Sequence, residues 1–240
     1  MLVLSADTSG KHGSVALTRG DEHNFELIEM VPLAGGTFSA QLVPQIADLL
    51  GRHHQSKTDL DGFVVASGPG SFTGLRVGLA AIKGLAEVLQ KPIAAVSLLE
   101  VLALAANSDG HIVAVLDAGR AQAYVGEYKV RESRAKLVSE VLLNREEFLR
   151  FAGARSQAAI VTCDSLPAEW ARSAQRAAQI VDHPLADAIA RIGIQKLLAG
   201  VTESAEELDA NYIRRSDAEI FSAPSERAPG APTGKRDING

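Results

Sequence analysis

The stretch VLSADTSGKHGSVAL at residues 3–17 decides the fold. Two apolar runs flank a turn rich in Asp, Ser and Gly, which is the pattern of a β-hairpin. The stretch VAVLDAGRAQAYVGEY at residues 113–128 repeats the order of strand, aspartate-containing turn and strand. Both halves of the chain therefore open with a similar hairpin, which indicates a duplicated unit.

The segments that follow each hairpin also occur in the same order. Apolar runs predict strands, and apolar residues spaced by three and four predict helices. Each half reads as three strands, a helix, a strand and a helix. The first half places these at residues 2–6, 13–18, 24–31, 39–52, 62–67 and 71–90, followed by a strand at 92–97 and a helix at 98–106. The second half places them at residues 111–116, 122–128, 136–142, 145–151 and 159–162 and from 184 onward.

This plan resembles the actin-like ATPase superfamily, in which each of two lobes opens with an Asp-containing hairpin. The resemblance implies an α/β protein of the ASKHA, or ribonuclease H-like, fold with two duplicated lobes. We expect an N-terminal lobe at residues 1–106, which carries the dimerisation surface, and a C-terminal lobe at residues 107–215. Residues 216–240 are rich in Pro, Gly and Ser without periodicity, which predicts a disordered tail.

The composition narrows the classes of function. The chain has 24 Lys and Arg against 29 Asp and Glu, a net charge of -5, so the chain as a whole has no nucleic-acid footprint. A single cysteine, Cys163, excludes a disulfide framework and is expected to pack as a small apolar group. No apolar stretch approaches about 18 residues and no signal peptide is recognisable, so we expect a soluble, cytoplasmic protein without membrane contact.

The first hairpin turn is a candidate phosphate site. In actin-like ATPases the two hairpins wrap the nucleotide, and Asp7, Thr8 and Ser9 fit that role. The alternative is a tight turn in which Asp7 bonds its own backbone. The second turn, with Asp117, is a poorer match because Arg120 would crowd or clamp a phosphate.

An actin-like ATPase also needs a late glycine-rich turn for the adenosine. After residue 159 the only glycines before the predicted tail are Gly193 and Gly200, so a complete ATP site is not expected. A free-standing ATPase or kinase that uses Asp7 and Asp117 is the alternative function. The six histidines show no HxxxH or HExxH spacing, and no nucleophile elbow is present. We therefore predict no metal site and no catalytic residue in this chain.

The stretch SGPGSFTGLRVGLAAIKGLA at residues 67–86 is rich in glycine but is not a P-loop, because Lys83 lies far into the predicted helix. Ser71 or Thr73 can cap that helix, and either can contact a nucleotide only by hypothesis. The helix is apolar nearly all round, which predicts burial on most sides. A glycine inside a helix costs about 1 kcal/mol relative to alanine, so Gly78 and Gly84 indicate close approach of another backbone. That neighbour lies either inside the domain or on a partner helix.

The same stretch closely resembles the signature of the TsaB (YeaZ) family. The resemblance extends to ADTSGKHGSVAL at residues 6–17, AVSLLEVLA at 95–103, LDAGRAQAY at 116–124 and NYIRR at 211–215. It implies a dimerisation subunit in the bacterial biosynthesis of threonylcarbamoyladenosine, the modified nucleoside beside the tRNA anticodon. Such a subunit has no transferase activity of its own, and the sequence gives no support to a glycoprotease activity.

The resemblance also implies the partners. A TsaD-type catalytic subunit carries the metal and the transfer site, a TsaE-type ATPase joins the assembly, and tRNA is met only indirectly through the complex. The subunit has no cofactor of its own, although ATP or ADP and Mg can bind at the complex interface. Alone, the chain is expected to form a homodimer. The implied interface comes from the helices near residues 39–52 and 71–90; we assign to it Leu42, Ile46, Leu49, Gly74, Gly78, Ala81 and Leu85.

The chain departs from the family pattern in two places. Phe38 stands where the family usually carries a histidine before its first long helix. The second hairpin turn, AGRAQAY, is less polar than the family's usual turn, which predicts weak nucleotide binding.

Overall fold

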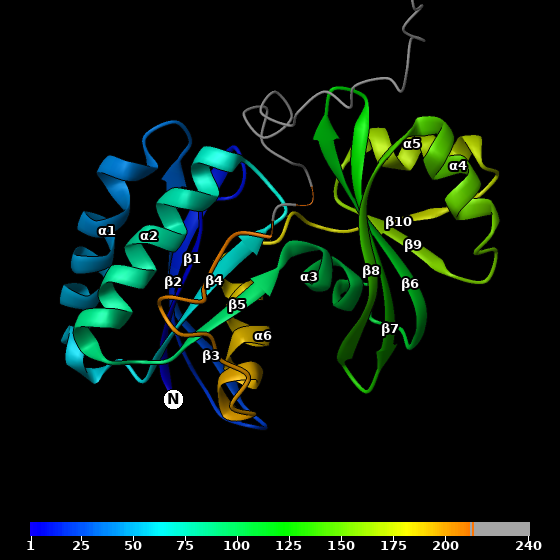
Figure 1. The fold of residues 1–240 in the computed structure, drawn as a ribbon. Coiled ribbons are helices and arrows are strands. Elements are labelled where there is room, and N and C mark those ends of the chain that lie inside the picture. Colours follow the sequence, from blue (N-terminus) through cyan, green and yellow to red (C-terminus); the bar gives the residue numbers. More distant parts are fainter. Residues whose placement is uncertain (212, 214–240) are drawn as a thin grey trace, which may run out of the picture.

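The computed structural model describes residues 1–211 and 213, and the predicted tail at 216–240 lies outside that part. Two five-stranded sheets dominate the molecule and stand side by side (Figure 1). The first has the order β3-β2-β1-β4-β5, and the second has the order β10-β9-β6-β7-β8. In both sheets the first two strands pair antiparallel, and the first strand pairs parallel with the fourth. The duplication predicted from the two hairpins is therefore confirmed.

The elements of the first half follow the predicted order. They are β1 (Leu2–Asp7), β2 (His12–Gly20), β3 (Phe25–Ala34), α1 (Phe38–Arg52), a 3-10 turn (Lys57–Asp59), β4 (Gly62–Gly68), α2 (Phe72–Leu89), β5 (Ile93–Ser97) and α3 (Leu98–Ala105). The strands of the hairpin are buried along almost their whole length. The apolar runs that predicted them therefore match strands covered on both faces.

The second half contains two elements that the sequence pattern did not predict. Its elements are β6 (Gly110–Gly119), β7 (Gln122–Arg131), β8 (Arg134–Asn144), α4 (Arg145–Gly153), β9 (Ala159–Thr162), α5 (Ser165–Ser173), β10 (Ala178–Ile180) and α6 (Ala186–Leu198). Helix α5 is amphipathic but only nine residues long, and most of its buried residues are small: Pro167, Ala168 and Ala171 beside Trp170. Strand β10 has three residues and is mostly exposed. Short segments with few large apolar residues give a weak signal over the roughly 11–18 residues in which periodicity is read.

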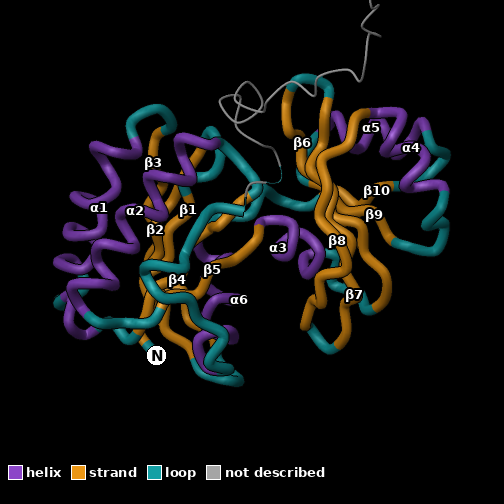
Figure 2. Tube along the Cα trace, in the orientation of Figure 1, coloured by secondary structure: helices purple, strands orange, loops and turns teal. Residues whose placement is uncertain are grey.

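Helices and sheets alternate as five layers, which Figures 1 and 2 show from left to right. Helices α1 and α2 cover the outer face of the first sheet, and α4 and α5 cover the outer face of the second. Between the sheets lie α3 and α6, in one apolar cluster that includes residues of both sheets. This arrangement is the two-lobed actin-like α/β fold expected from the sequence.

The two central helices exchange places between the halves. Helix α3, from the first half, packs mainly against β6, β7 and β8. Helix α6, from the second half, packs against β1, β2 and β4. Helix α6 thus lies on the first sheet although its residues fall in the range predicted for the C-terminal lobe. The division at 1–106 and 107–215 therefore does not describe where these helices pack.

No helix in the described part of the chain is long and apolar enough to cross a membrane.

Candidate functional site

The glycines of the signature stretch make room for the turn of the first hairpin. A Cβ added at Gly74 would overlap the carbonyl oxygen of Thr8, and one at Gly78 would overlap the Thr8 hydroxyl. A Cβ at Gly70 would lie 2.5 Å from the carbonyl oxygen of Ser9. The backbone of α2 therefore packs directly on the turn between β1 and β2. Of the two alternatives left open by the sequence, the structure supports contact inside the domain for Gly78.

Gly84 is different, because an added Cβ would meet nothing within 4 Å. Of the two alternatives left open by the sequence, a close neighbour inside the domain is excluded for Gly84, and a neighbour on a partner helix stays a prediction. Its side of α2 is exposed.

The three predicted phosphate contacts in the first turn are buried and bonded within the chain. The Thr8 hydroxyl donates to the carbonyl of Gly74 at 2.7 Å. The Ser9 hydroxyl and amide donate to Asp7 Oδ1 at 2.6 and 2.8 Å. In this structure the Thr8 and Ser9 hydroxyls are engaged within the chain and inaccessible, and a role of the turn in phosphate binding stays a prediction. The turn matches the alternative in which Asp7 bonds its own backbone.

Asp7 is nevertheless an unusual carboxylate. Its side chain is 0% exposed, and its Oδ2 atom has no hydrogen-bond partner among the described residues. Burial raises the pKa of Asp7, and the bonds from Ser9 and the nearby His183 counteract only part of this effect. Burial therefore makes the ionised form of this carboxyl group less favourable in the folded chain than in water.

Asp117 closes its own turn. Its Oδ1 atom accepts a 2.8 Å bond from the amide of Gly119, while its amide donates to Asp164 Oδ2 at 2.8 Å. This is the local geometry of an Asx turn. Its role in nucleotide binding stays a prediction.

Ser71 caps α2, as the sequence predicted. Its Oγ atom accepts a bond from the amide of Gly74 at 3.3 Å, and its own amide donates to the carbonyl of Ser9 at 2.6 Å. Thr73, two residues further along, is exposed. Contact of either hydroxyl with a ligand stays a prediction.

Most of the residues assigned to a partner interface face the interior. Leu42, Ile46 and Leu49 are buried in the core beneath α1. Gly74 and Gly78 face the hairpin turn. The assignment of Ile46, Leu49, Gly74 and Gly78 to an interface is corrected, because the apolar stripe of a surface helix packs first on its own sheet. Leu42 is buried but also lines the groove between α1 and α2, so its assignment stays open. Ala81 and Leu85 are partly exposed, so their assignment stays open.

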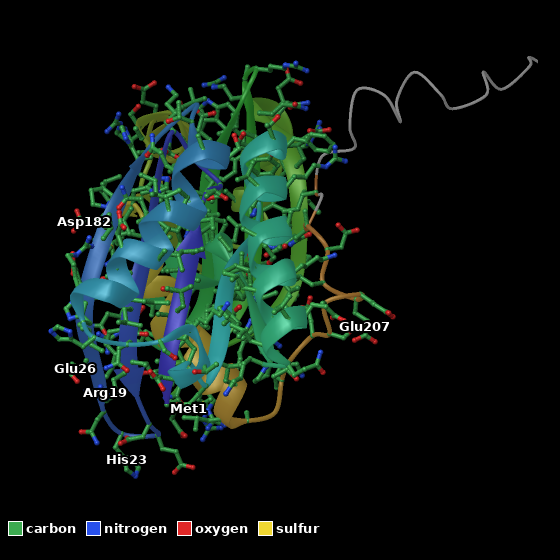
Figure 3. All side chains as sticks on the ribbon, turned by 90° about the vertical axis from the view of Figure 1, so that its left-hand side faces the viewer. Met1, Arg19, His23, Glu26, Asp182 and Glu207 are labelled. Atoms are coloured by element: carbon green, nitrogen blue, oxygen red, sulfur yellow. The ribbon has the colours of Figure 1, made fainter. Side chains whose placement is uncertain are left out.

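The surface that α1 and α2 leave uncovered is a shallow apolar groove. Figure 3 looks onto the two helices, which lie side by side in front of the first sheet. The groove between them has a volume of about 440 Å³. Its lining comes from both helices: Ser39, Leu42, Val43, Phe72, Thr73, Arg76, Val77, Ala80 and Ala81. Val43 is 51% exposed although it is a large apolar side chain.

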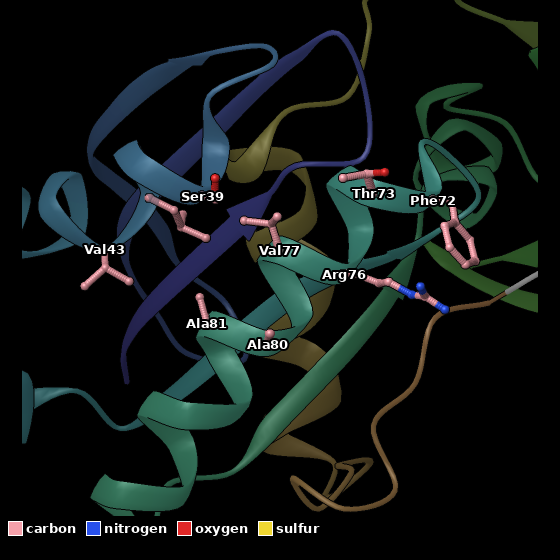
Figure 4. A pocket seen from close by; sticks show the side chains of 9 residues that line it. Ser39, Val43, Phe72, Thr73, Arg76, Val77, Ala80 and Ala81 are labelled. Atoms are coloured by element: carbon pink, nitrogen blue, oxygen red, sulfur yellow. The ribbon is translucent and has the colours of Figure 1, made fainter.

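In Figure 4, Val77 points toward Ser39 across the groove, and Phe72 and Arg76 lie on the other flank of α2. The guanidinium carbon of Arg76 lies 3.7 Å from the centre of the Phe72 ring. Aromatic and arginine side chains are both enriched in protein–protein interfaces, and this cation–π contact joins one of each. Sequence reasoning did not find most of this lining, because periodicity alone does not show which side of an apolar helix remains uncovered. The missed residues are Ser39, Val43, Phe72, Arg76, Val77 and Ala80.

Phe38, which replaces the family's usual histidine, is the first residue of α1 and belongs to the core. A Cβ added at Gly13 would meet the Phe38 ring at 2.7 Å, so the ring packs on the backbone of the hairpin. Phe38 therefore contributes apolar packing at the position where the family's usual histidine would place an imidazole.

Two further features concern reactive groups. Within residues 1–211 and 213, no group of three or more His, Cys, Asp or Glu is placed to hold a metal ion. Burial, with a smaller effect of Asp164, raises the pKa of Cys163 to about 12, which keeps its thiol protonated near neutral pH.

The comparisons with known proteins concern the family and the fold of this chain. The sequence model of the family described as "TsaD: tRNA N6-adenosine threonylcarbamoyltransferase" matches residues 32–221. The tRNA threonylcarbamoyladenosine biosynthesis protein TsaB of Bacillus subtilis is 38% identical over 132 residues, 55% of this chain and 56% of that protein. The TsaB protein of Escherichia coli is 32% identical over 136 residues, 55% of this chain and 57% of that protein. The chain belongs to the TsaD family, in its TsaB (YeaZ) branch.

Solved structures of the TsaB branch have the same fold. A Pseudomonas aeruginosa protein described as similar to peptidase YEAZ superposes with a TM-score of 0.69 at 26% identity, over 89% of this chain and 99% of that one. YeaZ from the same organism superposes with a TM-score of 0.68 at 23% identity, over 88% of this chain and all of that one. At this identity the match shows a shared fold alone. The sequence matches span little more than half the length of the curated TsaB relatives. The resemblance read from residues 67–86 is therefore confirmed at the level of the family.

Proposed function

We propose that this chain is a non-catalytic scaffold and activating subunit in the biosynthesis of tRNA threonylcarbamoyladenosine. It binds a TsaD-type catalytic subunit, which supplies the metal and the transfer site. The names of the Bacillus subtilis and Escherichia coli relatives support the pathway. A TsaE-type ATPase and a nucleotide with Mg at the boundary of the complex remain predictions from the family resemblance.

The observation that carries the proposal is the groove between α1 and α2. It presents Val43, Phe72 and Val77 at the surface beside Arg76. An exposed apolar patch with an aromatic and an arginine is typical of a protein–protein interface. The groove lies on the helix that begins with the family signature, so the same segment holds the hairpin inside and offers a surface outside.

The inaccessible first turn supports the non-catalytic part of the proposal. The hydroxyls of Thr8 and Ser9 bond inside the chain, so they are not available to a substrate. An independent ATPase or kinase would need these groups at the surface of its site.

The interface is tested by Val43→Arg. We expect binding to the TsaD-type subunit, measured by calorimetry, to weaken at least tenfold, because a guanidinium would be buried without a partner. The matched control is Val201→Arg, since Val201 is also an exposed valine, at 60%, and lies outside the groove. Equal binding by both variants would remove the groove from the interface.

The activity is tested by reconstituting tRNA modification with and without this chain. Modification should require the chain, fall with Val43→Arg and persist with Val201→Arg. Sedimentation of the chain alone tests the homodimer, because a self-complementary face can pair with its own copy. Modification at full rate without the chain would contradict the scaffold role.

A further inference from the structure

The hairpin of β7 and β8 carries four cations on one exposed face. Lys129 lies directly opposite Lys136, and Arg131 lies directly opposite Arg134. All four are exposed, whereas the alternate residues Tyr128 and Val130 are buried against the central helices. Because strand residues alternate between faces, the four cations share the outer face of the second sheet.

Like charges directly opposite one another destabilise a sheet, so this pairing opposes folding. The only salt bridge in the group joins Arg131 to its chain neighbour Glu132 at 3.4 Å, with both side chains highly exposed. Such a pair contributes little. Lys129, Arg134 and Lys136 form no salt bridge with any described residue. Within the described chain, most of the repulsion among the four cations is thus left uncompensated.

Three carboxylates lie near the patch, Asp109, Glu127 and Glu132, and they are too few to cancel four cations. Asp109, on the loop before β6, accepts a 3.1 Å bond from the amide of Glu132. Glu127, the next residue up the same face, is buried and lies 2.8 Å from Arg155 Nε and 3.0 Å from His111 Nε2. Arg155 therefore neutralises Glu127, so Glu127 does not reduce the positive charge of the four exposed cations.

The fold also leaves this half of the sheet open. Helices α4 and α5 pack on the apolar part of the outer face, around Val113, Val125 and Phe148. In Figure 1, β7 and β8 continue well below these helices. The cations stand on this uncovered continuation, in a chain whose net charge is -5. Acidic residues outnumber basic residues in the chain as a whole. A local cluster of cations therefore indicates a surface that binds an anionic ligand.

We propose that Lys129, Arg131, Arg134 and Lys136 form a binding surface for the phosphate backbone of RNA. The inference rests on the proposed function, because tRNA is the polyanion that the assembly must hold. It differs from the expectation that this chain meets tRNA only indirectly. The two cross-strand pairs give two adjacent rows of positive charge, which suit a chain of phosphates and carry no base recognition.

The test uses the full chain with Lys129, Arg134 and Lys136 all changed to Ala. Binding to an unmodified tRNA transcript is measured by fluorescence anisotropy from about 50 mM salt upward. We expect binding at least tenfold weaker than for the unchanged chain. The slope of log K against log salt should fall by about 2, because each lost phosphate contact removes about 0.7–0.9.

The matched control changes three other exposed cations, Lys57, Arg145 and Arg172, to Ala. Equal weakening by both triple variants would show a mere effect of net charge and would overturn the proposal. Unchanged binding by the first variant, or no binding by the unchanged chain, would also overturn it. Chemical denaturation should show the first variant at least as stable as the unchanged chain, since like-charge repulsion is removed.

Two further measurements are needed. One distinguishes RNA from other polyanions, and the other distinguishes the RNA surface from the proposed scaffold role. If inorganic polyphosphate loses binding to the triple variant and tRNA does not, the surface binds polyanions other than RNA and the proposal fails. Val43→Arg should keep tRNA binding while losing the catalytic partner. The scaffold role can therefore be refuted while the RNA surface is confirmed, and the RNA surface can be refuted while the scaffold role is confirmed.

Discussion

At the scale of single residues, α2 contains glycines with opposite surroundings. Gly74 faces the Thr8 carbonyl so closely that a Cβ cannot enter without moving backbone. Gly84 faces open space. The two positions look alike in the sequence, yet only the first is needed for packing.

This difference predicts opposite effects of the same substitution. Gly74→Ala should lower the free energy of unfolding by about 1–3 kcal/mol, because overpacking displaces the hairpin turn. Gly84→Ala should raise it by up to about 1 kcal/mol, because alanine favours an exposed helix. Urea unfolding monitored by circular dichroism measures both. Equal effects of the two substitutions would show that α2 does not pack on the turn as described.

At the scale of elements, α6 depends on a hydroxyl from the other half of the chain. Its N-cap, Leu185, offers no capping side chain. The amide of Ala186 instead donates to Ser14 Oγ at 2.9 Å, and the carbonyl of Ala186 accepts from Ser5 Oγ at 2.8 Å. Both serines belong to the first hairpin, so the hairpin fixes where α6 begins.

Ser14→Ala should therefore destabilise the protein although it removes only one atom. The buried amide of Ala186 would lose its partner, which costs about 1–3 kcal/mol. The control is Ser173→Ala, because the Ser173 hydroxyl bonds to Glu169 at an exposed site and its loss should change stability by less than about 0.5 kcal/mol. Guanidinium unfolding compares the two. Equal stability would mean that water replaces the Ser14 bond.

At the scale of the whole molecule, the exchanged helices join the two halves. The inner face of the first sheet is covered by α6, whose Ile189 and Ile194 are buried with Val3 and Val64. Leu208 and Ala210, near the end of the described chain, complete the core under α1 and α2. The first half therefore lacks part of its own core.

A fragment of residues 1–106 should not fold independently. Its sheet would expose the face that α6 covers in the full chain. The free energy of unfolding of a domain of this size is only about 5–15 kcal/mol, so the loss of that apolar burial is expected to prevent folding. We expect poor amide dispersion in proton NMR and strong binding of a hydrophobic dye, whereas the full chain should give dispersed signals. A well-dispersed, cooperatively unfolding fragment would contradict the need for α6 and would support a lobe boundary near residue 106.

The sequence predicted more of the fold than of the site. Alternation and helical spacing located every α-helix and strand except α5 and β10, and the two Asp-containing hairpins predicted the repeat of sheet order. The site was harder, because Leu42 and Val43 are adjacent apolar residues of one helix, and one is buried while the other is half exposed. The like-charged pairs of β7 and β8 needed the strand register, which a one-residue slip would have changed.

By itself, the sequence determined the family, the duplicated α/β plan and the lack of a P-loop, because these depend on local patterns and residue spacing. Only the tertiary structure decided that the signature glycines face the hairpin, that α3 and α6 exchange sheets, and which sides of α1 and α2 remain open. The physical reason is that burial depends on contacts between segments far apart in the chain. Ser14 and Ala186 are 172 residues apart, yet one hydrogen bond joins them.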